Sequence, residues 1–221
     1  MESYYTFHLE LEKLNKKLLG LTAMVEDRVR RAAKVIETHD AEQLKSIILS
    51  DYEIDEMEVE IEEDCLKIIA LHQPVASDLR FLIAVIKINA EVERIADYAV
   101  NIAMRVETIA KSEAQAMVAN IDFNEMSEKV ITMLQTSLDA LVNRDAALAR
   151  KVFLLDDEVD SYRSEIYKQV KEMIRNNPEH PGPLLNTYLI ARHLERIADR
   201  ATNISEEVIY LVEGVVTRTI S

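Results

Sequence analysis

The sequence contains very little glycine, proline or cysteine, and it has no tryptophan. Its 221 residues include only 3 Gly, 4 Pro and 1 Cys. A sandwich or barrel of many short strands needs a turn about every 8–12 residues, and so few turn-forming residues exclude it. The glycine-rich phosphate loops GxGxxG and GxxxxGK are also absent. Long helices joined by few turns are the architecture that remains.

Other absences restrict the expected cellular location of the protein and the molecules that it can bind. A single Cys65 excludes an intramolecular disulfide and any multi-cysteine metal site, and we expect it to be a buried structural thiol. No apolar run approaches 18 residues and the N-terminal segment lacks a signal-peptide core, which predicts a soluble cytoplasmic protein without membrane insertion. The net charge of −14 argues against binding to nucleic acid or anionic membrane. It suits a protein that binds cations or basic partner surfaces.

Apolar residues recur at steps of three or four through most of the chain, which is the period of an amphipathic helix. The breaks in this pattern predict six helices, which lie at about 11–38, 41–70, 76–110, 123–142, 146–174 and 184–212. Asp40 with Gln43, and Asp122 with Glu125, are expected to cap two helix starts. Gly214 is expected to end the last helix.

The chain contains an internal duplication. The segment E-R-I-A-D-x-A-x-N-I occurs at 93–102 and again at 195–204, an offset of 102 residues, and Asp40-Ala41 matches Asp145-Ala146 at an offset of 105. We therefore predict an all-α fold of two tandem three-helix bundles, a first repeat at residues 1–112 and a second repeat at residues 113–221. Short links between the helices make neighbours antiparallel.

Each repeat carries two acidic pairs at i, i+4 spacing, which places both carboxylates on one helix face. The pairs are Asp51 with Asp55, Glu93 with Asp97, Asp156 with Asp160, and Glu195 with Asp199. Like charges at this spacing destabilise a helix by a few tenths of a kcal/mol, and a multivalent cation offsets that repulsion. Clusters of oxygen donors suit Mg²⁺, Mn²⁺, Ca²⁺ or iron better than a structural zinc site.

Two interpretations of these pairs stay open at this point. With 40 acidic residues in the chain, about 7 such pairs arise by chance, and most acidic side chains on helices are solvated or salt-bridged. Recurrence at matching places in both repeats favours metal binding. Asn101 and Asn203 continue the two stripes and either add ligands or bond a neighbouring backbone group. Nearby arginines are expected to pair along their own helices; they are Arg94, Arg192, Arg196 and Arg200.

Catalysis finds no support in the sequence. It has no nucleophile motif, and no histidine stands three residues after a glutamate, as the di-iron four-helix oxidases require. We therefore predict a protein that is not an enzyme. The alternatives are a metal-dependent phosphohydrolase or oxidase that uses the same carboxylates, and a helical scaffold that either binds metal or is purely structural with empty acidic faces.

Two motifs together resemble a known family. His-Gln-Pro-Val-Ala-Ser-Asp-Leu-Arg at 72–80, followed by the doubled Glu-Arg-Ile-Ala-Asp, is similar to the PhoU family of accessory regulators of bacterial phosphate-specific transport. The resemblance covers essentially the whole chain, including the duplication. It implies two similar three-helix bundles and a role that is not enzymatic.

The resemblance also implies partners and a metal. PhoU-like proteins restrain phosphate uptake and phosphate-starvation two-component signalling by contacting the phosphate ABC transporter ATPase and a phosphate-sensing histidine kinase. Their E(D)xxxD motifs are described with iron, zinc, magnesium or manganese, which carries over here to all eight carboxylates named above. The second repeat lacks the Gln-Pro-x-Ala-x-Asp-Leu-Arg segment, so the two sites need not be equivalent. An elongated molecule of two bundles is compatible with a homodimer.

Overall fold

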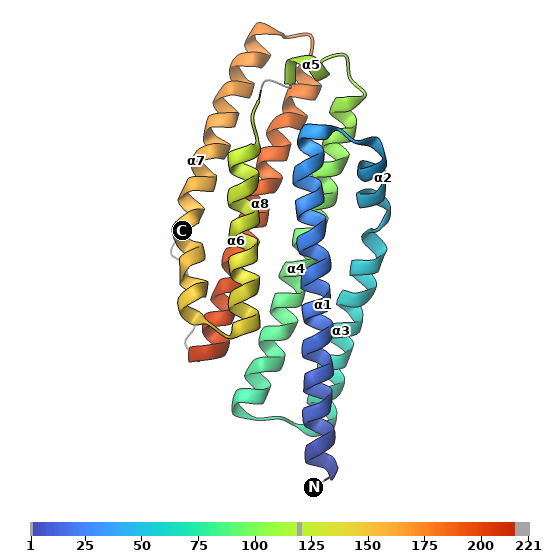
Figure 1. Ribbon diagram of the computed structural model, residues 1–221, viewed down its shortest axis with the longest axis vertical. Coiled ribbons are helices and arrows are strands. Elements are labelled where there is room, and N and C mark those ends of the chain that lie inside the picture. Colours follow the sequence, from blue (N-terminus) through green and yellow to red (C-terminus); the bar gives the residue numbers. More distant parts are fainter. Residues whose placement is uncertain (1, 119–120, 215–221) are drawn as a thin grey trace.

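The computed structural model describes residues 2–118 and 121–214, and only the backbone of residues 2–4 and 51. The described chain forms eight helices and no strand, arranged side by side in an elongated molecule (Figure 1). The helices are α1 (Glu2–Thr38), α2 (Ala41–Leu49), α3 (Asp51–His72), α4 (Ala76–Ala110), α5 (Gln115–Val118), α6 (Asn124–Asn143), α7 (Ala146–Asn176) and α8 (Pro181–Glu213). The predicted all-α class is confirmed.

Each repeat forms one bundle. In the first repeat α1 packs on α3 and α4, and in the second α6 packs on α7 and α8. The apolar stripe predicted for the first helix is buried as expected, with Leu14, Leu18 and Leu21 at its centre. Helix α3 lies at one edge of the molecule and α7 at the other, while α4 and α8 occupy the middle (Figure 1).

The single helix predicted at 41–70 is wrong, because the chain breaks it at Ser50 into α2 and α3. Arg28 on α1 is only 3% exposed, and its guanidinium donates a hydrogen bond of 2.5 Å to the Ser50 carbonyl. The carbonyl thus has a partner outside its own helix. Leu155 stands at the matching place of the second repeat and packs against the core, and there α7 is continuous. The donor is distant in sequence, so no local pattern signals the break.

The helix ends follow the sequence in part. Asp40 caps α2 as predicted, accepting hydrogen bonds of 3.0 Å from the amides of Glu42 and Gln43. The capping box at Asp122 is wrong in detail, because α6 begins at Asn124 and Asp122 accepts from that amide instead, at 2.9 Å. Helix α8 starts three residues earlier than predicted because Pro181 fits a first helical turn.

The two repeats meet along α4 and α8, which run antiparallel. Lys87 pairs with Glu207, and Glu91 pairs with Arg200. Further along, the Arg105 guanidinium donates to Asn186, so the residue numbers of the contacts rise along α4 and fall along α8. Both helices bury apolar side chains into one core that is continuous through both repeats. The boundary at residues 112 and 113 lies between α4 and α5 and stays a prediction.

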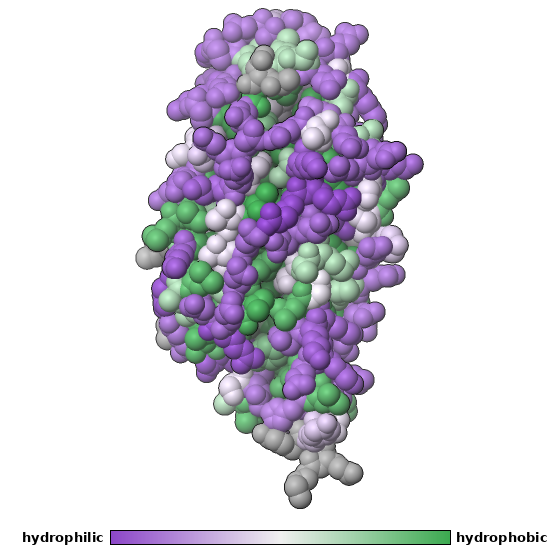
Figure 2. Space-filling model, viewed as in Figure 1, coloured by the Kyte–Doolittle hydropathy of each residue, from purple (hydrophilic) through white to green (hydrophobic). Residues whose placement is uncertain are grey.

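The face of the molecule shown in Figure 2 is mostly hydrophilic, with scattered apolar side chains. Within the described ranges, every helix is too short or too polar to cross a membrane.

Candidate metal centre

Helices α3 and α4 bring the acidic side chains of the first repeat together. Asp55 lies on α3, and Glu93 and Asp97 lie one turn apart on α4. A hydrogen bond of 2.8 Å from the buried Asn89 side-chain amide to the Glu58 carbonyl fixes the register of the two helices at this level. The side chain of Asp51 lies outside the described residues.

The pKa of Glu93 shows that the carboxylates of α3 and α4 lie close enough to affect one another. Burial, together with the nearby charges of Asp97, Glu58 and Asp55, raises the pKa of Glu93 to about 7. A cluster of this kind favours either a proton or a bound cation, because both relieve the repulsion among desolvated carboxylates.

Glu58 is a member of this cluster that the sequence prediction missed. Its side chain is half-buried on α3, and burial together with Glu62 and Asp55 raises its pKa. It lies one helical turn beyond Asp55, a spacing that the i, i+4 search passes over. The four described side chains Asp55, Glu58, Glu93 and Asp97 are called the first-repeat cluster below.

The second repeat brings its predicted carboxylates together in the same way. Asp199 on α8 and Asp160 on α7 act on Asp156, whose pKa is raised mainly by burial. Burial also raises the pKa of Glu195, with Asp199 and Asp160 adding to the shift. These four residues, Asp156, Asp160, Glu195 and Asp199, form the second-repeat cluster.

Arginines make the two clusters chemically different. The residue that matches Glu58 in the second repeat is Arg163, 105 positions later, and its Nε lies 3.2 Å from Glu195 Oε1. Arg196 also donates to Asp199 at 2.9 Å. The second-repeat cluster therefore carries cations of its own, whereas Arg94, which matches Arg196, pairs with Glu91 at 2.7 Å.

The clusters are not closed metal shells as they stand. Among the residues that the structure describes, no three histidine, cysteine, aspartate or glutamate side chains stand in a metal-binding arrangement. The first-repeat cluster nevertheless fits a hard cation in its chemistry, because its donors are all oxygens, and burial and the neighbouring carboxylates both raise the pKa of Glu93. In the second-repeat cluster a cation has to compete with Arg163 and Arg196.

Neighbouring polar residues have other partners. The Asn101 side chain donates to the Asp97 carbonyl at 2.9 Å, so it bonds the backbone. Asn203 donates to the Glu91 carboxylate at 3.0 Å, and Arg200 pairs with the same carboxylate at 3.1 Å. The expectation of pairing along one helix is therefore right for Arg94 and wrong for Arg200, whose partner belongs to the other repeat.

Comparison with known protein families decides the identity of this architecture. The model of the PhoU domain matches residues 18–106 and again residues 123–208, one match in each repeat. The chain belongs to the PhoU family. The two matches contain all eight predicted carboxylates.

Curated relatives and solved PhoU structures agree over nearly the whole chain. A Clostridium acetobutylicum protein named phosphate-specific transport system accessory protein PhoU homolog is 34% identical over 94% of each chain. The Escherichia coli accessory protein PhoU is 31% identical over 94% of this chain and 86% of its own. The crystal structure of PhoU from Pseudomonas aeruginosa has a TM-score of 0.89 at 33% identity, covering 95% of this chain and 100% of that one.

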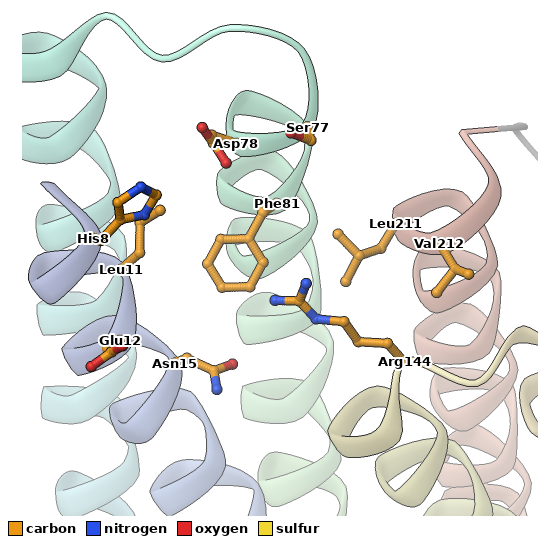
Figure 3. A pocket seen from close by; sticks show the side chains of 10 residues that line it. All are labelled: His8, Leu11, Glu12, Asn15, Ser77, Asp78, Phe81, Arg144, Leu211 and Val212. Atoms are coloured by element: carbon orange, nitrogen blue, oxygen red, sulfur yellow. The ribbon is translucent and has the colours of Figure 1, made fainter. Parts of the chain in front are cut away.

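The PhoU segment at 72–80 builds the end of the molecule rather than the carboxylate clusters. Ser77 and Asp78 lie in the first turn of α4, beside a cavity of about 580 Å³ bounded by α1, the α6–α7 turn and the end of α8 (Figure 3). Arg144 reaches in from that turn, and its guanidinium lies 5.5 Å from the Phe81 ring centre. Arg80 lies over the Tyr210 ring at 5.8 Å. This segment thus joins the two repeats.

Proposed function

We propose that the protein is a cytoplasmic accessory regulator of phosphate-specific transport, which restrains phosphate uptake and phosphate-starvation signalling through protein contacts and without catalysis. The observation that supports this most is family membership over nearly the full chain: relatives named as accessory proteins of this transport system match 94% of it. Its partners are the phosphate ABC transporter ATPase, the cytoplasmic part of a phosphate-sensing histidine kinase and, as a homodimer, a second copy of the chain.

Direct binding tests this proposal. The purified protein is titrated against the transporter ATPase and the kinase fragment from its own source, and in parallel its gene is deleted in cells carrying a phosphate-starvation reporter. We expect binding at about micromolar Kd or tighter, and a reporter that stays active when phosphate is plentiful. Absence of binding to both partners, together with an unchanged reporter, overturns the regulatory role.

We also propose that the regulator holds a multivalent cation, and that the two repeats hold it unequally. Asp51, with the first-repeat cluster, would bind the cation, which would neutralise the clustered carboxylates and link α3 to α4. The second-repeat cluster would bind it more weakly, because Arg163 and Arg196 already occupy Glu195 and Asp199. Of the family metals, oxygen donors favour iron, magnesium or manganese over zinc.

Four variants at matched positions test the inequality. Glu93→Gln removes a carboxylate from the first-repeat cluster, and Glu195→Gln removes its counterpart. Glu58→Arg gives the first repeat the residue of the second, and Arg163→Glu does the reverse. Metal content is measured by elemental analysis of protein purified without chelator, and the Tm is measured with and without Mn²⁺.

We expect Glu93→Gln and Glu58→Arg to lose most of the bound metal and the Tm increase, Glu195→Gln to lose little, and Arg163→Glu to gain metal. A cation bound only by the folded state raises stability by RT ln(1 + [L]/Kd), about 2.7 kcal/mol at 100 times Kd. Equal metal content in the wild type, Glu93→Gln and Glu58→Arg contradicts the assignment of the site.

A further inference from the structure

The outward face of α3 carries a row of exposed apolar side chains. Tyr52, Val59 and Leu66 are 59%, 51% and 55% exposed. They are seven residues apart, so they lie nearly on one line along the helix, as in the seam of a coiled coil. Among the described helices, α3 packs on α1, α2 and α4 alone, and all three side chains of this row are more than half exposed.

The second repeat shows that the fold does not need apolar residues in this row. The residues that match Tyr52, Val59 and Leu66 at an offset of 105 are Asp157, Ser164 and Lys171. They stand on α7, which packs on its neighbours as α3 does. A single exposed apolar residue is ordinary, but three stand in register on one repeat and none stands at the matching positions of the other, so the fold itself does not require them.

Acidic residues border the row on both sides. Glu56 and Glu63 lie along one side, and Glu62 lies along the other, beside Asp55 of the first-repeat cluster; all four are exposed. Within the described ranges, no lysine or arginine forms an ion pair with Glu56, Glu62 or Glu63, whereas Lys17 of α1 pairs with Glu60 and Asp64 on the inner side of the same helix.

The corresponding borders in the second repeat keep one carboxylate in place of four. Ser161 and Lys168 match Glu56 and Glu63, while Asp160 and Tyr167 match Asp55 and Glu62. The combination of an apolar heptad row with carboxylates on both sides is therefore present on α3 and absent from α7.

We propose that this face of α3 binds a basic amphipathic helix of a partner protein. The partner's apolar residues, repeating every seven positions, would pack against Tyr52, Val59 and Leu66, and its flanking lysines and arginines would meet the carboxylate borders. The residues of α3 alone indicate the kind of helix that would bind. The assignment of that helix to a transport or signalling component rests on the proposed function.

Charge disfavours the other occupants of this face. A second copy of the chain would bring two acidic helices together, and like charges across an interface oppose association. An anionic membrane surface attracts basic segments and repels this one.

The test uses synthetic helical peptides of about three heptads. One has leucine at the seam positions and lysine at the flanking positions, a second replaces the lysines by glutamate, and a third scrambles the basic sequence. Each is fluorescently labelled and titrated with the full-length protein at low and high salt. The key variant is Val59→Ser with Leu66→Lys, which installs the residues of the second repeat. The control is Leu154→Ser, which removes an apolar side chain that is 77% exposed on α7.

We expect the basic heptad peptide alone to bind, with an affinity that falls as salt rises. The double variant weakens this binding at least tenfold, Glu56→Gln with Glu63→Gln weakens it chiefly at low salt, and Leu154→Ser leaves it within about twofold. Thermal unfolding by circular dichroism confirms that each variant is folded. Equal affinity for the scrambled peptide, or unchanged affinity in the double variant, overturns the proposal.

Three further outcomes separate this inference from its alternatives. If sedimentation shows that the double variant turns a dimer into a monomer while no peptide binds, the face joins two copies and the proposal is wrong. If the double variant loses the peptide but binds the transporter ATPase and the kinase fragment as the wild type does, the α3 site stands and those partners use another surface. If the wild type binds the ATPase but no peptide, the proposed function stands and the α3 site is overturned.

Discussion

Arg200 on α8 and Glu91 on α4 form an ion pair of 3.1 Å that joins the two repeats. Both side chains are largely shielded from solvent, 22% and 13% exposed, and Glu91 also accepts from Asn203 and pairs with Arg94. One carboxylate thus serves three donors. Its removal leaves two of them, Arg200 and Asn203, unpaired at the interface between the repeats.

Glu91→Ala is therefore expected to lower the free energy of unfolding by about 2 kcal/mol, because partly buried donors lose their acceptor. The control is Glu172→Ala, which breaks the pair with Arg175, where both side chains are more than 60% exposed. An exposed pair contributes about 0–1 kcal/mol. Urea unfolding of the three proteins provides the comparison, and equal losses in the two variants would show that Glu91 acts as a surface charge.

Cys65 is expected to resist alkylation in the folded protein. Its side chain is 0% exposed, and burial raises the pKa of the thiol to about 12. The thiolate is the reactive form, so it is nearly absent from the folded state at pH 8, where an unfolded thiol is substantially ionised. Mass spectrometry after iodoacetamide treatment should show no modification in buffer and complete modification in urea. Rapid labelling in buffer at pH 8 would contradict the buried position.

Two glycines are expected to respond to alanine in opposite directions. Gly214 ends α8 with φ 73, and a Cβ there would lie 2.6 Å from Arg80 Nη1, so Gly214→Ala should cost about 1 kcal/mol or more. Gly20 lies inside α1 with nothing within 4 Å of a Cβ, so Gly20→Ala should stabilise by about 0.5–1 kcal/mol. Chemical denaturation of both variants measures the two changes; a stabilising Gly214→Ala would count against the left-handed end of α8.

The hydrogen bond from Arg28 to the Ser50 carbonyl, where α2 ends and α3 begins, can be tested by replacing both residues with those of the second repeat. Met133 and Leu155 stand where the first repeat has Arg28 and Ser50. Arg28→Met alone should destabilise by about 2–3 kcal/mol, because the Ser50 carbonyl loses its donor in a buried place. Adding Ser50→Leu should restore part of this loss. A double-mutant cycle in urea measures the coupling, and strictly additive effects would mean that the two residues act independently.

The periodicity of apolar residues was sufficient to predict most of the fold. The stripe of α1, the cap at Asp40 and the end of α8 at Gly214 are local features, each encoded within a few neighbouring residues. The duplication was visible because both copies kept the same Glu-Arg-Ile-Ala-Asp segment. Placing the paired carboxylates of each repeat on adjacent helices followed from short links and antiparallel packing.

What the sequence did not reveal depends on contacts between distant segments. The break at Ser50 requires a guanidinium from α1, and the bond from Arg200 to Glu91 requires α8 to lie against α4. Glu58 and Arg163 were missed because they lie outside the repeated acidic pairs, although a comparison of α3 with α7 at the offset of 105 exposes their opposite charge. The periodicity predicts which face of a helix is buried, but it does not predict which residue of another helix packs against that face.

The central pairing of α4 with α8 also sets how far apart other molecules can be held. Because these two helices fill the middle, α3 and α7 face away from each other on opposite flanks (Figure 1). Two proteins that dock on those flanks would not compete for space, because the helices of both repeats lie between them. Under the proposed function, the molecule would hold two partners at once, at a separation that α4 and α8 set.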